Sequence, residues 1–393
     1  MDQTEVTAVD LFCGAGGMSV GLQSAGFRIL GAVDYWETAC RTYSRNFDHP
    51  VVSANVREIS GSDLLAKFGA GQSHPDLVVG GPPCQGFSIQ RIGKDHDSRN
   101  SLVLEFARLI LELRPKMFLM ENVLGLHGRR GREFASELED VLVRGGYRVR
   151  FSVVNAAEYG VPQFRRRVFY YGWLDGSTHP FQFPAPTHTA LCFRTVWDAI
   201  GDLPSPPANL RTEMPDPLHR RMNLSQRNIE RLRHIPPGGG FENLPVELRV
   251  DCHKGGADKI GHRNVYGRLS SDAPANTITA RFDSFTRGKF AHPFEDRNIT
   301  LREGARLQTF DDAFTFEGSQ EDIAAQIGNA VPPRLSTLIA KALIENLRNP
   351  ALVAPGIITP SDQISLFQPT GDPAECRKFP ERFGQVPSTP HSA

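Results

Sequence analysis

The sequence feature that most limits the possible folds is the alternation of short apolar runs with amphipathic stretches in the first half of the chain. Apolar runs bounded by turn residues predict strands at Val6–Phe12, Arg28–Val33, Asp76–Gly80, Met117–Met120 and Val168–Gly172. Apolar residues that return every three or four positions predict helices at Gly17–Ala25, Glu37–Asn46 and Leu102–Leu113. This order is typical of a parallel sheet with crossover helices, so we expect an open, doubly wound α/β fold.

The character of the sequence changes near residue 180. From 181 to 319, frequent prolines, isolated aromatic residues and basic residues without a clear period predict a smaller, irregular domain. Helical spacing returns at Leu301–Phe310, Asp322–Ala330 and Leu335–Leu347. The expected organisation is a large domain over 1–180, a small domain over 181–319, a closing segment over 320–349 and a disordered tail over 350–393.

Composition limits the function less than the motifs do. The 393 residues are 40% hydrophobic and 22% charged with a formal net charge of zero, which argues weakly against a surface coated in positive charge. The six cysteines show neither a CxxC pair nor a Cys/His ligand spacing, so we expect no metal site. Without a leader pattern or an apolar stretch of about 18 residues, the chain is expected to be cytoplasmic and to have no membrane span.

A glycine-rich turn follows the first expected strand. The stretch VDLFCGAGGMSVGLQSAGF places Gly14 and Gly16 between strand and helix, where the lack of a Cβ lets the backbone approach a ligand closely. Asp34 ends the next strand about 20 residues later, a position at which a carboxylate usually holds a ribose diol. Taken alone, the glycines are also compatible with a tight turn that binds nothing.

Two cofactor classes use a turn of this kind. Dinucleotide enzymes favour GxGxxG, whereas this chain reads FxGxGG, with Phe12 leading into the turn. An adenosine cofactor without phosphates, such as S-adenosylmethionine (SAM), needs aromatic walls more than an anion site, and Phe12 and Tyr35 could supply them. Asn55 follows the third strand-like segment and could reach the adenine edge. These residues favour SAM.

A single thiol stands at the end of an apolar strand in DLVVGGPPCQGFS. Ligands of doubly wound folds bind outside the carboxyl ends of the strands, so Cys84 is expected to face the cofactor crevice. Pro82 and Pro83 stiffen the chain before it. An isolated cysteine is more often a small buried apolar residue, but this position favours a nucleophile.

Three charged residues are expected at the same sheet edge as Cys84. Glu121 ends the next strand, in MFLMENV. Arg165 and Arg167 are alternate residues entering a later strand, so both should point to one face while Arg166 points away. Two guanidinium groups there would orient the carboxylate and stabilise an anionic adduct.

Together these residues closely resemble the DNA (cytosine-5)-methyltransferase family, in particular the bacterial restriction-modification enzymes. Seven blocks follow the order of the family: DLFCGAGG, GGPPCQGFS, DSRNSL, ENV, QFRRR, ITLREGARLQTF and QIGNAVPP. The resemblance implies a Rossmann-like, SAM-dependent large domain, a small target-recognition domain, and a C-terminal segment that completes the large one. It covers most of the chain from Thr7 to Leu347.

The resemblance also implies roles for individual residues. It makes Cys84 the nucleophile, Glu121 the residue that contacts the target base, and Arg165 and Arg167 the active-site arginines. Positions matching the SAM site are Phe12, Gly14, Gly16, Asp34, Tyr35, Asn55, Pro82, Leu102 and Asn329. Two of them depart from the family pattern, since Asp34 stands where glutamate is usual and Asn55 where aspartate is common.

The expected reaction is methylation of C5 of a cytosine in a specific double-stranded DNA sequence. The thiolate of Cys84 would add to C6 while Glu121 bonds N3, and the base must leave the stack because C6 is inaccessible in a duplex. Ser88 or Gln90 would fill the vacated space. Thr277, in a stretch resembling a recognition-domain signature, and Arg281 are expected near the DNA.

Other readings remain open at this point: a tRNA cytosine-5 methylase, a catalytically inactive DNA-binding regulator and, as a poor fit, a nicotinamide oxidoreductase. Expected partners are double-stranded DNA and a cognate restriction endonuclease, for a monomeric enzyme near the nucleoid. The tail stretch QISLF, Gln363–Phe367, resembles the pentapeptide by which bacterial DNA-processing proteins bind the sliding clamp. Packing of its apolar residues on the catalytic domain is the alternative.

Overall fold

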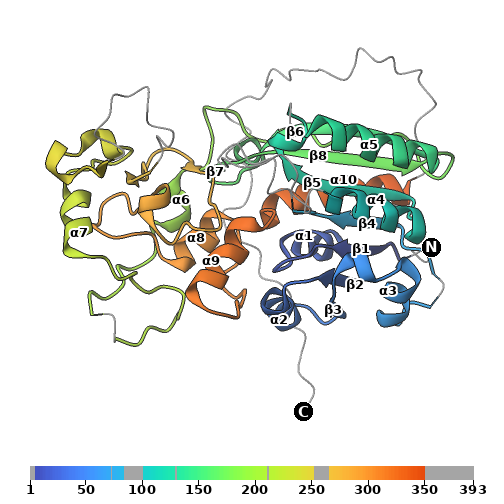
Figure 1. Ribbon diagram of the computed structural model, residues 1–393, viewed down its shortest axis with the longest axis horizontal. Helices are drawn as coiled ribbons and strands as arrows, with labels where there is room; N and C mark the ends of the chain where they lie inside the picture. Colours follow the sequence, from blue (N-terminus) through green and yellow to red (C-terminus); the bar gives the residue numbers. More distant parts are fainter. Residues whose placement is uncertain are drawn as a thin grey trace.

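A seven-stranded sheet forms the centre of the larger of two lobes in the computed structural model, which describes residues 5–71, 73–83, 101–128, 131–209, 212–251 and 265–349 (Figure 1). Its order is β3-β2-β1-β4-β5-β8-β6. The strands are β1 Thr7–Leu11, β2 Arg28–Asp34, β3 Val51–Ser53, β4 Leu77–Gly80, β5 Met117–Val123, β6 Tyr147–Asn155 and β8 Arg166–Leu174. Only β8 runs antiparallel to its neighbours β5 and β6 within this sheet.

The chain reverses its direction of travel across the sheet between β1 and β4. It proceeds outward from β1 to β3 and then returns to place β4 on the other side of β1. Ligands of doubly wound folds bind at such a reversal, outside the carboxyl ends of the strands, which here are those of β1 and β4. The glycine-rich turn and the segment leading to Cys84 begin there.

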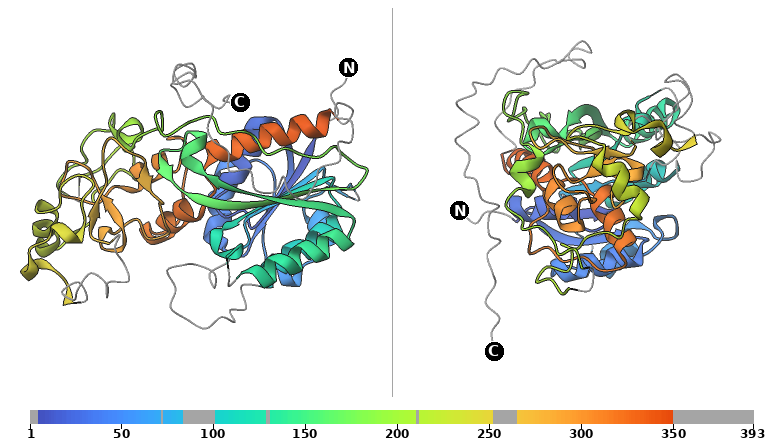
Figure 2. Two further views of the ribbon diagram at one scale, coloured as in Figure 1. Left: turned by 90° about the horizontal axis from the view of Figure 1, so that it is seen from above. Right: turned by 90° about the vertical axis from the view of Figure 1, so that its left-hand side faces the viewer.

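Helices cover both faces of the sheet (Figure 2). One face carries α3 Gly61–Lys67, α4 Leu102–Leu113 and α5 Arg132–Arg144, and the other carries α1 Gly17–Ala25, α2 Glu37–Asn46 and α10 Pro333–Arg348. The closing helix α10 lies directly against α1, where the Ser336 hydroxyl donates to the Gly17 carbonyl over 2.9 Å. A Cβ at Gly21 would lie 2.0 Å from the Ser336 hydroxyl, so the two backbones approach closely.

The smaller lobe is built mostly from loops and short elements, on the left of Figure 1. Its helices are α6 Val196–Ile200, α7 Gln226–Arg233, α8 Leu301–Leu307 and α9 Gln320–Asn329. Two small ladders pair β7 Gln163–Phe164 with β10 Ala275–Asn276, and β9 Gly267–Arg268 with β11 Lys289–Ala291. Short 3-10 turns lie in this lobe at η6 Phe241–Asn243, η7 Val246–Leu248 and η10 Phe285–Arg287, and in the sheet lobe at η1 Val56–Glu58, η4 Leu124–Leu126 and η5 Ala156–Tyr159.

The doubly wound α/β fold is confirmed, and α1, α2 and α4 have the predicted bounds. The sequence reading missed β6, in which arginines alternate with apolar residues because the strand lies at the sheet edge and is only partly buried. It also missed α3 and α5. The helix predicted over Leu301–Phe310 ends at Leu307, because Thr309 adopts a left-handed conformation with φ of 71°. In the part of the chain that the structure describes, no helix is long and apolar enough to cross a bilayer.

Candidate active site

The glycine-rich turn joins β1 to α1 through a left-handed backbone. Phe12, Gly14 and Gly16 have φ values of 57°, 53° and 96°. A Cβ at Gly14 would meet no atom within 4 Å, so its conformation rather than crowding favours glycine. A Cβ at Gly16 would lie 2.4 Å from the Phe47 ring, so this glycine lets the turn rest on α2 and the chain after it.

Asp34 fastens this turn to the end of β2. Its Oδ2 accepts a hydrogen bond of 2.8 Å from the Gly14 amide, and its Oδ1 accepts one of 2.8 Å from the Trp36 amide. Burial raises the pKa of the Asp34 carboxyl, and these amide donors oppose the rise. Beside it, the side chain of Tyr35 is 73% exposed. The acidic residue and the aromatic residue expected to face a cofactor thus lie next to the turn.

Asn55 lies at the end of the next strand of the sheet. Its carbonyl oxygen accepts from the Arg57 amide over 3.2 Å, and its Nδ2 donates to Glu58 over 2.7 Å. It lines an open cavity of about 640 Å³, whose other lining residues are Ser53, Ala54, Glu58, Ile59, Asp63, Ala66 and Lys67. Leu102 is buried at the start of α4, and Asn329 is exposed at the end of α9.

The segment after β4 lies beside Glu121. Pro82 is buried, and its carbonyl accepts from the Asn122 side chain over 3.1 Å. A Cβ at Gly81 would lie 3.7 Å from Glu121 Oε2. Glu121 is therefore next to the strand end from which the chain continues to position 84. Cys84, Ser88 and Gln90 lie outside the described residues.

Glu121 and Arg167 form a largely buried ion pair. Arg167 Nε is 2.9 Å from Glu121 Oε1, and the two side chains are 17% and 11% exposed. The N–H is not directed at the oxygen, and Oε1 has no hydrogen-bond partner among the described residues. Buried polar atoms are normally satisfied, so a carboxylate oxygen held this way at a sheet edge indicates a binding site.

Arg165 joins the sheet lobe to the smaller lobe. It is 2% exposed, and its Nη1 donates to the Ile278 carbonyl over 3.1 Å and to the Gly328 carbonyl over 3.0 Å. Burial lowers the pKa of Arg165; the charge of Arg167 lowers it further and Glu121 opposes this. Its Nε is buried without a hydrogen-bond partner among the described residues. The expected grouping of Glu121 with both arginines is present in the structure.

Gln163 and Asn122 were not singled out from the sequence, although both belong to quoted blocks. The Gln163 amide nitrogen donates to the Leu307 carbonyl over 3.0 Å, and its oxygen accepts from the Ile278 amide over 3.1 Å. It therefore fixes the extended segment from β7 to Arg165 against the small lobe. Its place two residues before Arg165, on the same face of an extended chain, was the available signal.

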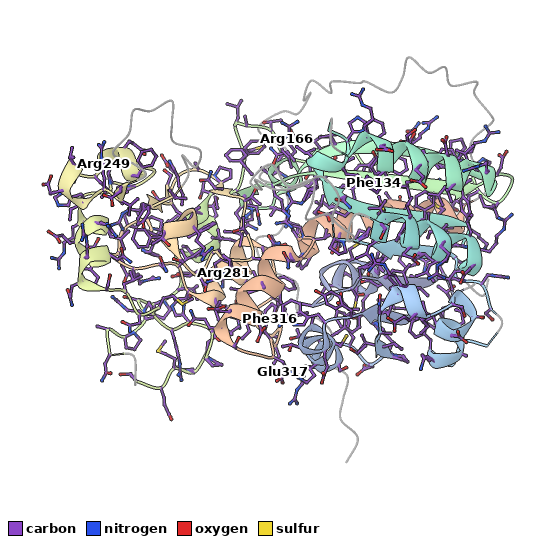
Figure 3. All side chains as sticks on the ribbon, in the orientation of Figure 1. Phe134, Arg166, Arg249, Arg281, Phe316 and Glu317 are labelled. Atoms are coloured by element: carbon purple, nitrogen blue, oxygen red, sulfur yellow. The ribbon has the colours of Figure 1, made fainter. Side chains whose placement is uncertain are left out.

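The expected DNA contacts are distributed around the junction of the lobes. The Thr277 hydroxyl donates to the Phe164 carbonyl over 2.7 Å. Arg281 is 41% exposed and pairs with Asp283 at 3.3 Å and with Glu321 of α9 at 3.7 Å. In Figure 3, Arg281 lies beside α9 and Arg166 lies where the two lobes meet. No group of three or more metal-ligating side chains occurs among the described residues.

Comparison with known proteins gives the family. The model of the C-5 cytosine-specific DNA methylases matches residues 6–345. The chain is 37% identical to the type II methyltransferase M1.HphI of Haemophilus parahaemolyticus, covering 86% of this chain and 87% of that protein. It is 36% identical to the type II methylase M.HgiDII of Herpetosiphon aurantiacus, covering 85% and 94%.

Solved structures agree with this assignment. A prophage-encoded E. coli protein assigned as a DNA modification methyltransferase superposes with a TM-score of 0.69 at 27% identity, over 87% of this chain and 99% of that one. The Dnmt2 methyltransferase of S. pombe, at 18% identity and a TM-score of 0.56 over 87% and 99%, shares the fold. The match over nearly the whole described chain, together with the site geometry, shows that this protein belongs to the C-5 cytosine-specific DNA methylases.

Proposed function

We propose that the chain transfers a methyl group from SAM to C5 of a cytosine turned out of a specific double-stranded DNA sequence, through a transient bond between Cys84 and C6. The observation that carries this proposal is the buried Glu121 carboxylate. One of its oxygens has no hydrogen-bond partner among the described residues, beside the strand end that leads to Cys84 and within the field of Arg165 and Arg167.

The residues at the ends of β1, β2 and β3 fit SAM. The turn offers a backbone cradle without a Cβ at Gly14 and Gly16, Phe12 enters it, and Tyr35 presents an exposed ring. Each Asp34 oxygen accepts one backbone amide and has a further lone pair, with which it would accept a hydrogen bond from a ribose hydroxyl. Asn55 would lie at the adenine edge. Leu102, Asn329 and Pro82 would complete the walls. Bound SAM supplies an electrophilic methyl group.

The protein side chains make the cytosine ring reactive. The Cys84 thiolate would form a bond to C6 while Glu121, carrying a proton, donates it to or hydrogen-bonds N3, so that the π electron pair of the C5–C6 bond moves onto C5. Arg167 would hold the Glu121 carboxylate in place, and both guanidiniums would stabilise the negative charge that develops on the ring. After transfer, the C5 proton leaves and its electron pair reforms the C5–C6 double bond as the sulfur departs.

The lobes divide the work in this proposal. Residues 1–180 form the catalytic domain and 320–349 complete it, with α10 packed on α1 and α9 lying against α8 of the smaller lobe. Residues 181–319 recognise the target, and 350–393 form a tail. A cytosine must leave the stack to reach Glu121, at a cost of a few kcal/mol. Ser88 or Gln90 would fill its place, with Thr277 and Arg281 near the DNA.

The type II methyltransferases among its relatives support a restriction-modification role. In that role the chain acts as a monomer near the nucleoid, protecting DNA from a partner endonuclease. The Gln363–Phe367 stretch would bind a sliding clamp. It lies outside the described residues.

Trapping of a covalent adduct tests the reaction. Duplex DNA containing 5-fluorocytosine cannot lose a proton from C5, so incubation with tritiated SAM should yield a stable adduct with the wild-type protein and none with Cys84→Ser. Bisulfite sequencing of a host that expresses the protein then gives the target. Methylation of tRNA alone would favour an RNA enzyme, and specific DNA binding without any adduct would favour an inactive regulator.

A further inference from the structure

A buried carboxyl group that the reaction above does not use lies directly below the glycine-rich turn. Asp10 is on β1, two residues before Phe12, and is 1% exposed. Its Oδ2 accepts a 2.6 Å hydrogen bond from the Ser19 hydroxyl at the start of α1. Its Oδ1 is buried without a hydrogen-bond partner among the described residues. An isolated buried carboxylate is costly, so this group is sensitive to any charge placed nearby.

Asp10 is the inner end of a chain of short hydrogen bonds. The Ser19 hydroxyl is 2.6 Å from the Tyr43 hydroxyl, which is 2.6 Å from Nε2 of the partly exposed His49. The chain runs from β1 through α1 and α2 to the loop after α2. It also supports the turn, because a Cβ at Gly16 would lie 3.1 Å from the Tyr43 ring. The carboxyl group and the turn therefore share one rigid support.

We propose that Asp10 makes this site selective for a cationic ligand over a neutral one, and that a cation bound at the turn expels the Asp10 proton through Ser19, Tyr43 and His49. The inference rests on the proposed cofactor. SAM carries a sulfonium charge that its demethylated product, S-adenosylhomocysteine, lacks. A negative charge below the turn would thus attract the methyl donor and give the neutral spent product no such gain.

The hydrogen bonds allow this proton to move with every atom accounted for. With Asp10 protonated, each hydroxyl donates outward and His49 Nε2 accepts, so the imidazole proton is on Nδ1. Movement of one proton along each bond leaves Asp10 ionised and every donor directed inward. His49, now protonated on both nitrogens, returns to neutrality by losing the Nδ1 proton to solvent. The net result is one proton released and a change of His49 tautomer.

The neighbouring groups set the pH range of this exchange. Burial, opposed by the Ser19 hydrogen bond and reinforced by the Asp34 charge, raises the pKa of Asp10 to about 7. Burial also raises the pKa of Cys13, Tyr43 and Cys40, and lowers that of His49 to about 4, which keeps these groups neutral near pH 7. A nearby cation lowers the pKa of Asp10, so its binding strengthens as pH rises through 7.

Calorimetric titration of the full chain with SAM and with S-adenosylhomocysteine tests the proposal. Between pH 6 and 8, in buffers of different ionisation enthalpy, SAM binding should release up to one proton and S-adenosylhomocysteine binding none. The affinity ratio of SAM to product should rise with pH, by at most about tenfold for each unit by which the cation lowers the pKa. Asp10→Asn should abolish both effects, whereas the control Asp140→Asn, at an exposed position on α5, should keep them.

The outcomes separate this proposal from the cofactor site itself. If the wild type binds neither compound, the cofactor assignment fails. If it binds both with the same pH dependence and proton count, or if folded Asp10→Asn still shows the difference, the role of Asp10 is wrong. Should Asp10→Asn not fold, ¹⁵N NMR of His49 in the wild type decides: SAM must shift its tautomer from Nδ1–H to Nε2–H at pH 7, and S-adenosylhomocysteine must not.

Discussion

The buried arginine Arg268 of the small lobe and the buried charges beside the end of β5 differ in how fully they are hydrogen-bonded. In the small lobe, Arg268 is 4% exposed and all five of its N–H groups find acceptors, in four backbone carbonyls and Asp296. Near the carboxyl end of β5, Glu121 and Arg165 are also buried, yet each keeps a polar atom without a hydrogen-bond partner among the described residues. The first arrangement holds a lobe together, and the second is ready to bind something else.

The difference explains why arginine clusters alone say little about function. Arg268 lies in the interior of the small lobe, and buried Arg231 donates to the Leu248 carbonyl and lies over the Tyr266 ring at 5.2 Å. Arg233, in the same region of the sequence, has a side chain that is 68% exposed and can reach a partner.

The largest expected effect comes from Glu121→Gln at the sheet edge. Loss of the carboxylate should reduce kcat/KM by about 10²–10⁴-fold, the usual contribution of a group that bonds or protonates the reacting base. The free energy of unfolding should change by no more than about 1–2 kcal/mol, because Arg167 keeps partial access to solvent. A methyl-transfer assay measures kcat/KM, and urea unfolding measures the free energy of unfolding. Glu37→Gln, at an exposed position, is the control. If the variant retains its turnover but loses much of its free energy of unfolding, Glu121 holds the fold together and does not bind the reacting base.

Arg268→Met should show the opposite pattern. Removing the guanidinium takes the donor from the buried Ile235 and His292 carbonyls, whereas the Leu232 and Glu295 carbonyls keep a backbone donor. We therefore expect a loss of about 3 kcal/mol in the free energy of unfolding. SAM affinity of the folded fraction should be unchanged. Arg233→Met is a matched control, since Arg233 also faces Asp296, at 3.8 Å, but on the surface. Equal stability of the two variants would show that the interior bonds of Arg268 contribute little.

Glu303 of the small lobe should make the free energy of unfolding depend on pH, with a smaller effect than the two substitutions above. It is 1% exposed and pairs with Arg297 through two contacts of 2.8 Å. Burial alone would raise its pKa, but the Arg297 hydrogen bonds and charge hold it below the ordinary value of 4.5. Its stabilisation is therefore complete above about pH 5 and lost as pH falls through the folded pKa. Urea unfolding between pH 6 and 3 should lose less stability in Glu303→Gln than in the wild type.

The smallest effect is expected for Arg281→Ala. Arg281 is itself 41% exposed, and its contacts with buried Asp283 and exposed Glu321 are long, at 3.3 Å and 3.7 Å, so stability should stay within about 1 kcal/mol. If it contacts a phosphate, the slope of log affinity against log salt concentration should fall by about 1 for every DNA sequence tested. Fluorescence anisotropy at several salt concentrations measures this slope. An unchanged slope would assign Arg281 to the support of α9.

The sequence predicted those parts of the molecule that depend on local periodicity. Helices α1, α2 and α4 follow from apolar spacing, and the grouping of Glu121, Arg165 and Arg167 follows from strand ends and alternation. Partners far apart along the chain could not be read in this way. The Gln163 bond to Leu307, the five acceptors of Arg268 and the Asp10–His49 chain depend on tertiary packing, which no local pattern encodes.

The contact of α10 with α1 sets the order in which this enzyme can mature. The Ser336 hydroxyl binds the Gly17 carbonyl at the very turn that would hold the cofactor. During synthesis, that turn therefore lacks this neighbour until the ribosome has made α10.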